Sequence, residues 1–250
     1  MFQGFYNLAS GVLTQTRKLN VISNNMVNVT TPGFRGDTFT ETTFRDVMMY
    51  RTGNMDKSGS TPIGEMNRIV AGDGNVTNYR KGGLTSTASS LDFALTSDGG
   101  FFEIQTEDGL RYTRNGSFVL DNQGYLYLDG AGRVMGTNGP IYLGVDKLDT
   151  DTMGGLYDGE TGQFLGRIRV VDFDDYEADL EKATGDLFIA TGNGRAIDAP
   201  IMQYYLEDSN VDPIKEMTDM MGTERALQSA AQIQRMYDQL MGQIVEIGPT

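Results

Sequence analysis

The acidic side chains between residues 172 and 181 form the densest group of potential metal ligands in the sequence. The group comprises Asp172, Asp174, Asp175, Glu177, Asp179 and Glu181. A calcium-binding EF-hand loop requires glycine at its sixth position and glutamate at its twelfth. Counted from Asp172, those positions hold Glu177 and Ala183, so the EF-hand pattern is absent. We therefore interpret this run as a solvated acidic loop and predict no metal site.

The composition also removes several classes of catalytic site. The chain has no histidine and no cysteine, which excludes an imidazole base, a thiolate nucleophile and a zinc–thiolate centre. Serine-hydrolase and phosphate-binding loop motifs are absent as well. The 34 acidic residues leave a carboxylate pair for glycoside cleavage open, but nothing in the sequence marks one pair as buried. We predict no catalytic residue, no metal and no cofactor.

Charge and hydropathy restrict the partners. Lys and Arg number 20 against 34 Asp and Glu, a net charge of -14 over 250 residues. Nucleic acids and anionic membrane surfaces attract clustered basic residues, so neither is a predicted partner. The apolar runs are too short for membrane insertion, and the N-terminus lacks the features of a cleaved signal peptide. The chain is expected to stay in the cytoplasm or to leave by a route that reads no cleaved signal.

The first 28 residues are predicted to form a helix. Apolar residues recur there at alternating spacings of three and four, interrupted only by Gln15; they are Phe5, Leu8, Val12, Leu19, Ile22 and Met26. This heptad seam is narrower than an ordinary core-facing stripe and is typical of a coiled coil. Thr31-Pro32-Gly33 prevents the helix from continuing.

A second long helix is predicted over residues 213–247. Asp212 is a suitable N-cap, and Pro213 occupies the first turn, where its missing N–H does no harm. A stripe at spacings of three and four contains Ala226, Ala230, Ile233, Tyr237, Leu240, Ile244 and Ile247. An earlier stripe of Ile214, Met217 and Met221 is out of phase with it, and the phase changes near Gly222. In a compact monomer the helices would pack on the rest of the chain. Seam-like spacing over many residues instead favours pairing of the two helices with each other and with sister subunits.

The middle of the chain has a different character. Residues 82–206 contain short apolar runs separated by turn signals such as Asn115-Gly116, which favours an antiparallel sandwich or barrel. Residues 36–81 lack strong periodicity and are interpreted as an extended or loop-like connector. The predicted fold class is α+β. Its terminal helices, within 1–35 and 207–250, pair into a coiled-coil-like domain, and the all-β domain lies between them.

Three segments resemble motifs of a known family. Residues 19–35 read LNVISNNMVNVTTPGFR and residues 207–217 read EDSNVDPIKEM; residues 99–118 contain Gly-Gly-Phe-Phe and Arg-Tyr-Thr-Arg-Asn-Gly-Ser-Phe. In this order and spacing they resemble the bacterial flagellar rod and hook family of axial proteins. The length resembles a rod subunit more than a hook subunit, and proximal and distal rod both remain open.

The resemblance implies a non-enzymatic structural subunit of the flagellar basal-body rod. Such a subunit is exported by the flagellar type III apparatus without a cleaved signal and lies outside the cytoplasm, across the periplasm or cell wall. It polymerises into a hollow helical shaft that transmits torque to the hook. The implied partners are further copies of the chain, neighbouring rod and hook axial proteins, and the export apparatus. A hook or hook-associated protein and a cell-wall-acting enzyme on an axial scaffold remain alternatives.

The helix seams and the family motifs together give the expected assembly residues. The paired asparagines disfavour a helix interior, so their amides are expected to fix the register between helices; alternatively, Asn28 is only a C-cap and the others are exposed. The expected set is Phe5, Leu8, Val12, Leu19, Ile22, Asn24, Asn25, Asn28, Thr31, Pro32, Gly33, Phe34, Ser209, Asn210, Val211, Pro213, Met217, Ile233, Leu240 and Ile244.

Overall fold

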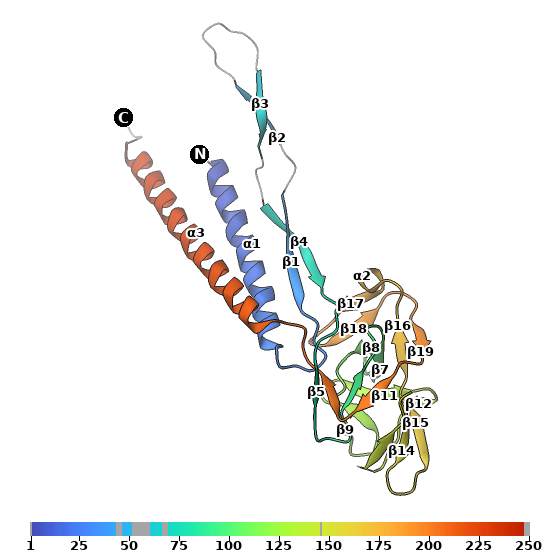
Figure 1. Cartoon of the computed structure of the whole chain (residues 1–250). Coiled ribbons are helices and arrows are strands. Elements are labelled where there is room, and N and C mark those ends of the chain that lie inside the picture. Colours follow the sequence, from blue (N-terminus) through green and yellow to red (C-terminus); the bar gives the residue numbers. More distant parts are fainter. Residues whose placement is uncertain (1, 44–46, 52–60, 67–69, 146, 248–250) are drawn as a thin grey trace. The chain divides into compact units, whose positions relative to one another are not determined.

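The structure, a computed structural model, has a helix at each end of the chain and a β-rich centre (Figure 1). It describes residues 2–43, 47–51, 61–66, 70–145 and 147–247. The chain divides into two compact units. The first comprises residues 1–24, 37–76 and 214–250, and the second comprises residues 25–36 and 77–213.

The two long helices match their predicted positions. Helix α1 spans Phe2–Val27, and helix α3 spans Pro213–Ile247. After α1 the amide of Thr31 donates to the carbonyl of Asn28 (3.1 Å), and Pro32 follows. Gly222 does not interrupt α3, which is continuous past the expected change of phase. Neither of these helices, nor any other in the described part of the chain, has the length and apolarity needed to span a membrane.

The shielded face of α3 differs from the apolar stripe seen in the sequence. Ile233 and Leu240 are 40% and 55% exposed, whereas Ala230 and Tyr237 are partly shielded. The shielded positions alternate in steps of four and three, and they include Glu216, Met220, Thr223, Leu227, Ala230, Gln234, Tyr237 and Met241. Apolar side chains therefore occupy both faces of α3. In α1 the shielded side chains follow the predicted seam, with Ile22 only 5% exposed.

Four strands that pair with one another lie within the described parts of residues 37–77. The strands are β1 (Asp37–Thr43), β2 (Val47–Arg51), β3 (Thr61–Met66) and β4 (Val70–Thr77). Strand β1 pairs with β4, and β2 pairs antiparallel with β3. An extended or loop-like connector is expected over residues 36–81. The strands described there are extended, and they pair with one another.

The second unit is built from short strands. Its largest sheet has the order β17-β18-β8-β7-β11-β10-β9, and it does not close into a barrel within the described residues. Its strands are β7 (Phe101–Thr106), β8 (Gly109–Thr113), β9 (Phe118–Leu120), β10 (Leu126–Leu128), β11 (Gly132–Gly136), β17 (Leu180–Lys182) and β18 (Leu187–Ala190). Beside this path, β11 pairs with β12 (Gly139–Pro140), and β7 pairs with β16 (Val170–Asp172), which pairs with β19 (Arg195–Ile197).

Smaller sheets complete this unit. Strand β5 (Leu84–Ser86) pairs with β21 (Tyr205–Glu207), and β6 (Phe93–Leu95) pairs with β20 (Ile201–Gln203). A three-stranded sheet contains β13 (Leu148–Thr150), β14 (Gly155–Asp158) and β15 (Phe164–Arg167). The described strands are short, as predicted for residues 82–206. They do not form a closed barrel, so that form of the prediction is wrong.

Two hydrophobic clusters lie on opposite faces of β7, because successive side chains of a strand point to opposite sides. Phe102 and Ile104 belong to the larger cluster, which also contains Phe118, Leu126 and Val134. Phe101 belongs to the smaller one, with Tyr112, Val171, Phe173, Leu180 and Phe188. Both clusters lie inside the second unit. This unit therefore has its own hydrophobic core.

The acidic run contains the short helix α2 (Tyr176–Asp179). The Asp175 carboxylate caps it by accepting from the amides of Glu177 and Ala178. Asp172 accepts from the Tyr176 hydroxyl (2.6 Å) and the Gly100 amide (3.0 Å). Burial, together with this bond to Asp172, raises the pKa of Tyr176 to about 12. These acids thus satisfy local donors, and no group of three or more acidic side chains is placed to hold a metal in the described part of the chain.

Candidate assembly site

The two terminal motifs meet inside the second unit. The amide of Gly33 donates to the carbonyl of Glu207 (2.7 Å), and the amide of Asn210 donates to the carbonyl of Phe34 (3.3 Å). The Asn210 side chain accepts from the amide of Gly36 (2.8 Å). Its Nδ2 donates to the carbonyls of Asn78 (2.6 Å) and Arg80 (2.8 Å). We call residues 33–36 and 207–210 the motif junction, since they join the two ends of the chain.

A buried ion cluster lies at this junction. Arg35 Nη2 is 2.6 Å from Glu207 Oε1, and Arg114 Nη1 is 3.2 Å from Glu207 Oε2. The three side chains are at most 1% exposed. Glu207 also accepts from the Gly82 amide (3.1 Å), while Arg114 donates to the carbonyls of Ser97 and Asp98. Burial lowers the pKa of Arg114, and the Glu207 carboxylate opposes that shift. One carboxylate therefore compensates two buried guanidinium groups.

Gly33 and Phe34 fit closely into the same site. Gly33 has φ +69°, and a Cβ atom there would lie 2.4 Å from the carbonyl carbon of Arg114. A side chain would be strained in its backbone and would also collide with its neighbour. Phe34 is fully buried, and the Lys182 ammonium lies 4.1 Å from the centre of its ring while donating to the carbonyl of Arg35. The Gly-Phe pair of the Thr-Pro-Gly-Phe sequence is thus explained by packing within the chain.

The junction and its neighbouring contacts account for five of the twenty residues expected to act in assembly. Val211 packs at Gly36, where a Cβ atom would lie 2.8 Å from its Cγ2, and the Ser209 hydroxyl accepts from the Val211 amide (3.3 Å). These contacts involve five of the expected residues, and all five lie in the second unit. They are Gly33, Phe34, Ser209, Asn210 and Val211. Thr31 and Pro32 precede them, and Pro213 opens α3. No intersubunit role is needed to explain the conformation of these residues.

Sequence reasoning missed the three charged residues of the cluster. Arg35 and Glu207 stand at the edges of the two terminal motifs, and Arg114 stands in the central one. Charged side chains are normally exposed, so residue type argues against burial. One feature of the sequence could have indicated the cluster. Each of the three family-like motifs contains one of these residues, and two basic residues are matched by one acidic residue.

The asparagines at the end of α1 differ in environment. Asn25 is 2% exposed, Asn28 is partly shielded, and Asn24 is exposed. The Thr31 hydroxyl donates to Asn28 Oδ1 (3.3 Å). Along the α1 seam, Leu8, Val12 and Leu19 are partly shielded. The side chains of Phe5 and Ile244 lie outside the described residues.

The helices expose many large apolar side chains. In α3 the exposed set is Ile214, Met217, Met221, Ile233, Met236 and Leu240; in α1 it is Leu13 and Val27, with Val27 and Ile214 each 78% exposed. Scattered apolar residues are ordinary on a surface, but rows of them along a helix indicate a surface that another molecule covers. These rows are the candidate assembly surfaces.

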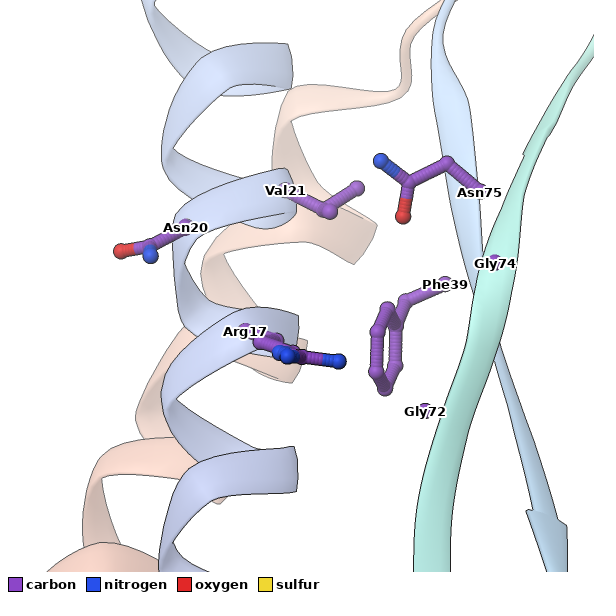
Figure 2. A pocket seen from close by; sticks show the side chains of 7 residues that line it. All are labelled: Arg17, Asn20, Val21, Phe39, Gly72, Gly74 and Asn75. Atoms are coloured by element: carbon purple, nitrogen blue, oxygen red, sulfur yellow. The ribbon is translucent and has the colours of Figure 1, made fainter.

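A hollow of about 330 Å³ lies beside α1 in the first unit (Figure 2). Its lining comprises Arg17, Asn20 and Val21 of α1, Phe39 of β1, and Gly72, Gly74 and Asn75 of β4. The Arg17 side chain points toward the ring of Phe39 in Figure 2. That ring lies against Gly72, where a Cβ atom would be 2.4 Å from Phe39 Cζ. Nearby, Lys18 pairs with Glu41 at 3.5 Å.

Comparison with known proteins gives the family. Residues 5–35 match the model for the flagella basal body rod protein, and residues 202–247 match the model for the C-terminal region of the flagellar basal body rod FlgEFG proteins. The chain is 30% identical to the flagellar basal-body rod protein FlgG of Bacillus subtilis, with 99% of each chain covered. It is 30% identical to the rod protein FlgF of Caulobacter vibrioides, with 98% of each covered, and 25% identical to the flagellar hook-basal body complex protein FlhO of B. subtilis, with 99% of each covered. The chain therefore belongs to the family of flagellar basal-body rod proteins.

Proposed function

We propose that this chain is a non-enzymatic subunit of the flagellar rod that polymerises with copies of itself and with neighbouring axial proteins. The supporting observation is the rows of exposed apolar side chains along α1 and α3. The polymer is a hollow helical shaft that transmits torque to the hook. The subunit reaches its place outside the cytoplasm through the flagellar type III export apparatus, without a cleaved signal peptide.

The proposed mechanism assigns assembly to the ends of the chain. Residues 1–35 and 207–250 act as one polymerisation domain in which α1 and α3 pair in a coiled-coil-like manner. Residues 36–81 connect it to the β-rich domain, residues 82–206. A repeated head-to-tail contact that does not close into a ring produces a helical filament.

The energetics are compatible with this mechanism. Complete burial of a large apolar side chain contributes about 1.5–3 kcal/mol. The six side chains of α3 are 40–78% exposed, so completing their burial contributes an amount comparable with an association cost of about 4–15 kcal/mol. A hook-associated role and an enzyme on an axial scaffold have less support, because FlgG and FlgF relatives covered from end to end carry rod names.

Localisation tests the proposal. The chain, carrying a tag in an exposed β-turn of the second unit, replaces the native copy, and purified hook–basal bodies are labelled for electron microscopy. Label on the rod, together with loss of motility when the chain is deleted, is expected. Label confined to the hook or to the cytoplasm would exclude the proposed role.

A further inference from the structure

Each long helix carries an exposed stripe with heptad spacing. The α1 stripe has steps of four, three, four and three, and consists of Leu13, Arg17, Asn20, Asn24 and Val27. The α3 stripe has steps of three, four, three and four, and consists of Ile214, Met217, Met221, Glu224 and Gln228. All ten side chains are exposed. Such spacing keeps each set on one side of its helix and suits helix-to-helix packing.

The two stripes have opposite charges. Residues 1–36 contain no acidic residue, and Arg17 is the cation of the α1 stripe. Glu224 is the anion of the α3 stripe, next to Met217 and Met221. Among the residues that the structure describes, neither Arg17 nor Glu224 forms an ion pair, whereas the adjacent Lys18 is paired with Glu41.

The spacing of the charged and apolar residues matches in one direction only. Val27 lies ten positions after Arg17, and Glu224 lies ten positions after Ile214. The two residues of each pair are therefore about 15 Å apart along their helix. When two such helices are antiparallel, Arg17 faces Glu224 while Val27 faces Ile214. In a parallel arrangement with Arg17 opposite Glu224, Val27 would face Gln234, which lies on the shielded side of α3.

The surroundings of Arg17 can receive a carboxylate. Its guanidinium lies at a hollow of about 330 Å³ that the Asn75 side chain also lines, whereas the Asn20 side chain points away from it (Figure 2). Guanidinium and amide N–H groups are donors, and a carboxylate accepts only. Figure 1 shows α1 and α3 running in opposite directions, with the two termini at the same end. Copies that share one orientation therefore bring α1 of one against α3 of the next in the antiparallel sense.

We propose that the α3 stripe of a second copy packs antiparallel on the α1 stripe, with Glu224 of that copy bound by Arg17 at the hollow. This inference rests on the proposed function, because it specifies the contact that rod assembly uses. The ion pair fixes the axial register. The apolar members of the stripes, which are Leu13 and Val27 of α1 and Ile214, Met217 and Met221 of α3, supply buried area.

Charge reversal tests the pair in full-length chains, by incorporation into basal bodies and by sedimentation of the purified protein. Arg17→Glu and Glu224→Arg are each expected to raise the concentration needed for assembly about tenfold, since like charges across an interface are strongly unfavourable. The double variant restores assembly. Asp219→Arg is the matched control, because Asp219 is exposed and lies about 140° around α3 from Glu224.

Cross-linking locates the contact. The chain contains no cysteine, so Asn20→Cys in one copy and Met221→Cys in another introduce the only thiols. Mixed and treated with a mild oxidant, they should form a disulfide between two chains, whereas Asn20→Cys mixed with Asp219→Cys should not. If the wild type assembles, neither charge reversal has an effect and no 20–221 cross-link forms, the inference is overturned while the proposed function stands. Failure of the wild type to enter basal bodies would instead overturn the proposed function.

Discussion

At the motif junction, three charged side chains connect the segment after α1 with the segment before α3. Arg35, Arg114 and Glu207 are almost completely buried, and Glu207 is the shared partner of both arginines. The attraction in such a cluster is offset by the desolvation of three charges, so its presence adds little net stability. Its absence is different, because removing Glu207 would leave two guanidinium groups buried without a counter-charge. The cluster therefore adds little to the stability of the fold, but it disfavours any arrangement of the junction that separates Glu207 from the two arginines.

The first prediction concerns Glu207. Glu207→Gln is expected to lower the free energy of unfolding of the second unit by about 3–5 kcal/mol, the usual effect of breaking a buried ion pair on one side. Urea unfolding measures it. The matched control is Glu160→Gln, which breaks the exposed pair with Lys147 (3.4 Å, side chains 79% and 71% exposed) and should change stability by at most about 1 kcal/mol. Equal effects of the two substitutions would show that the junction does not depend on its carboxylate.

The second prediction concerns Gly33. Gly33→Ala combines a positive φ with a backbone collision at 2.4 Å and is expected to destabilise the chain by more than about 2 kcal/mol. Gly130→Ala is the control, because Gly130 has nearly the same φ of +71° but open space at the Cβ position. Thermal unfolding of both variants separates the two causes. If Gly33→Ala is no worse than Gly130→Ala, the close approach to Arg114 is unimportant.

The third prediction is a pH dependence. Burial raises the pKa of Glu103 above its ordinary 4.5, and Arg169, 3.3 Å away, opposes the shift. Between the ordinary and the raised pKa the native chain binds more protons than the unfolded chain, so the contribution of Glu103 to stability falls as pH rises. The stability of the wild type minus that of Glu103→Gln should decrease from pH 4 to pH 7 in urea titrations. A difference that increases over this range would mean that Arg169 outweighs burial.

At the scale of elements, the sequence predicted the features that depend on neighbouring residues, namely the positions and ends of the long helices. Both long helices were predictable because Asp212-Pro213 and Thr31-Pro32-Gly33 mark their ends and because their apolar residues repeat. The pairing of β1 with β4 was not, since those strands lack the alternation that identifies a sheet face. The sequence also did not predict which face of α3 is shielded, because this helix carries apolar residues on both sides. The buried arginines were missed because burial contradicts their residue type.

The fourth prediction belongs to the exposed face of α3. Leu240→Asp removes a side chain that is 55% exposed, so the stability of the isolated chain should change by no more than about 0.5 kcal/mol. Assembly should nevertheless fall sharply, because a charge would enter an apolar interface. Swimming assays and basal-body yield measure this, with the exposed Gln239→Asp as control. Normal motility of the Leu240 variant would remove this face from the assembly surface.

At the scale of the whole molecule, the two units differ in how they satisfy their apolar residues. The second unit buries two hydrophobic clusters within itself. The first unit leaves rows of large apolar side chains exposed on α1 and α3. This division between the units underlies the proposal that other subunits complete the apolar surface of the helices. That completion is the central claim.

Methionine oxidation tests this claim most directly. Met217, Met221 and Met236 are 53%, 48% and 48% exposed, so peroxide should convert them readily to sulfoxides in the monomer. We predict that in intact rods their oxidation rates fall relative to Met153 of the second unit, which is 41% exposed. Mass spectrometry of the two samples gives the rates. Equal relative rates in monomer and rod would contradict the claim that other subunits cover the exposed faces of the terminal helices.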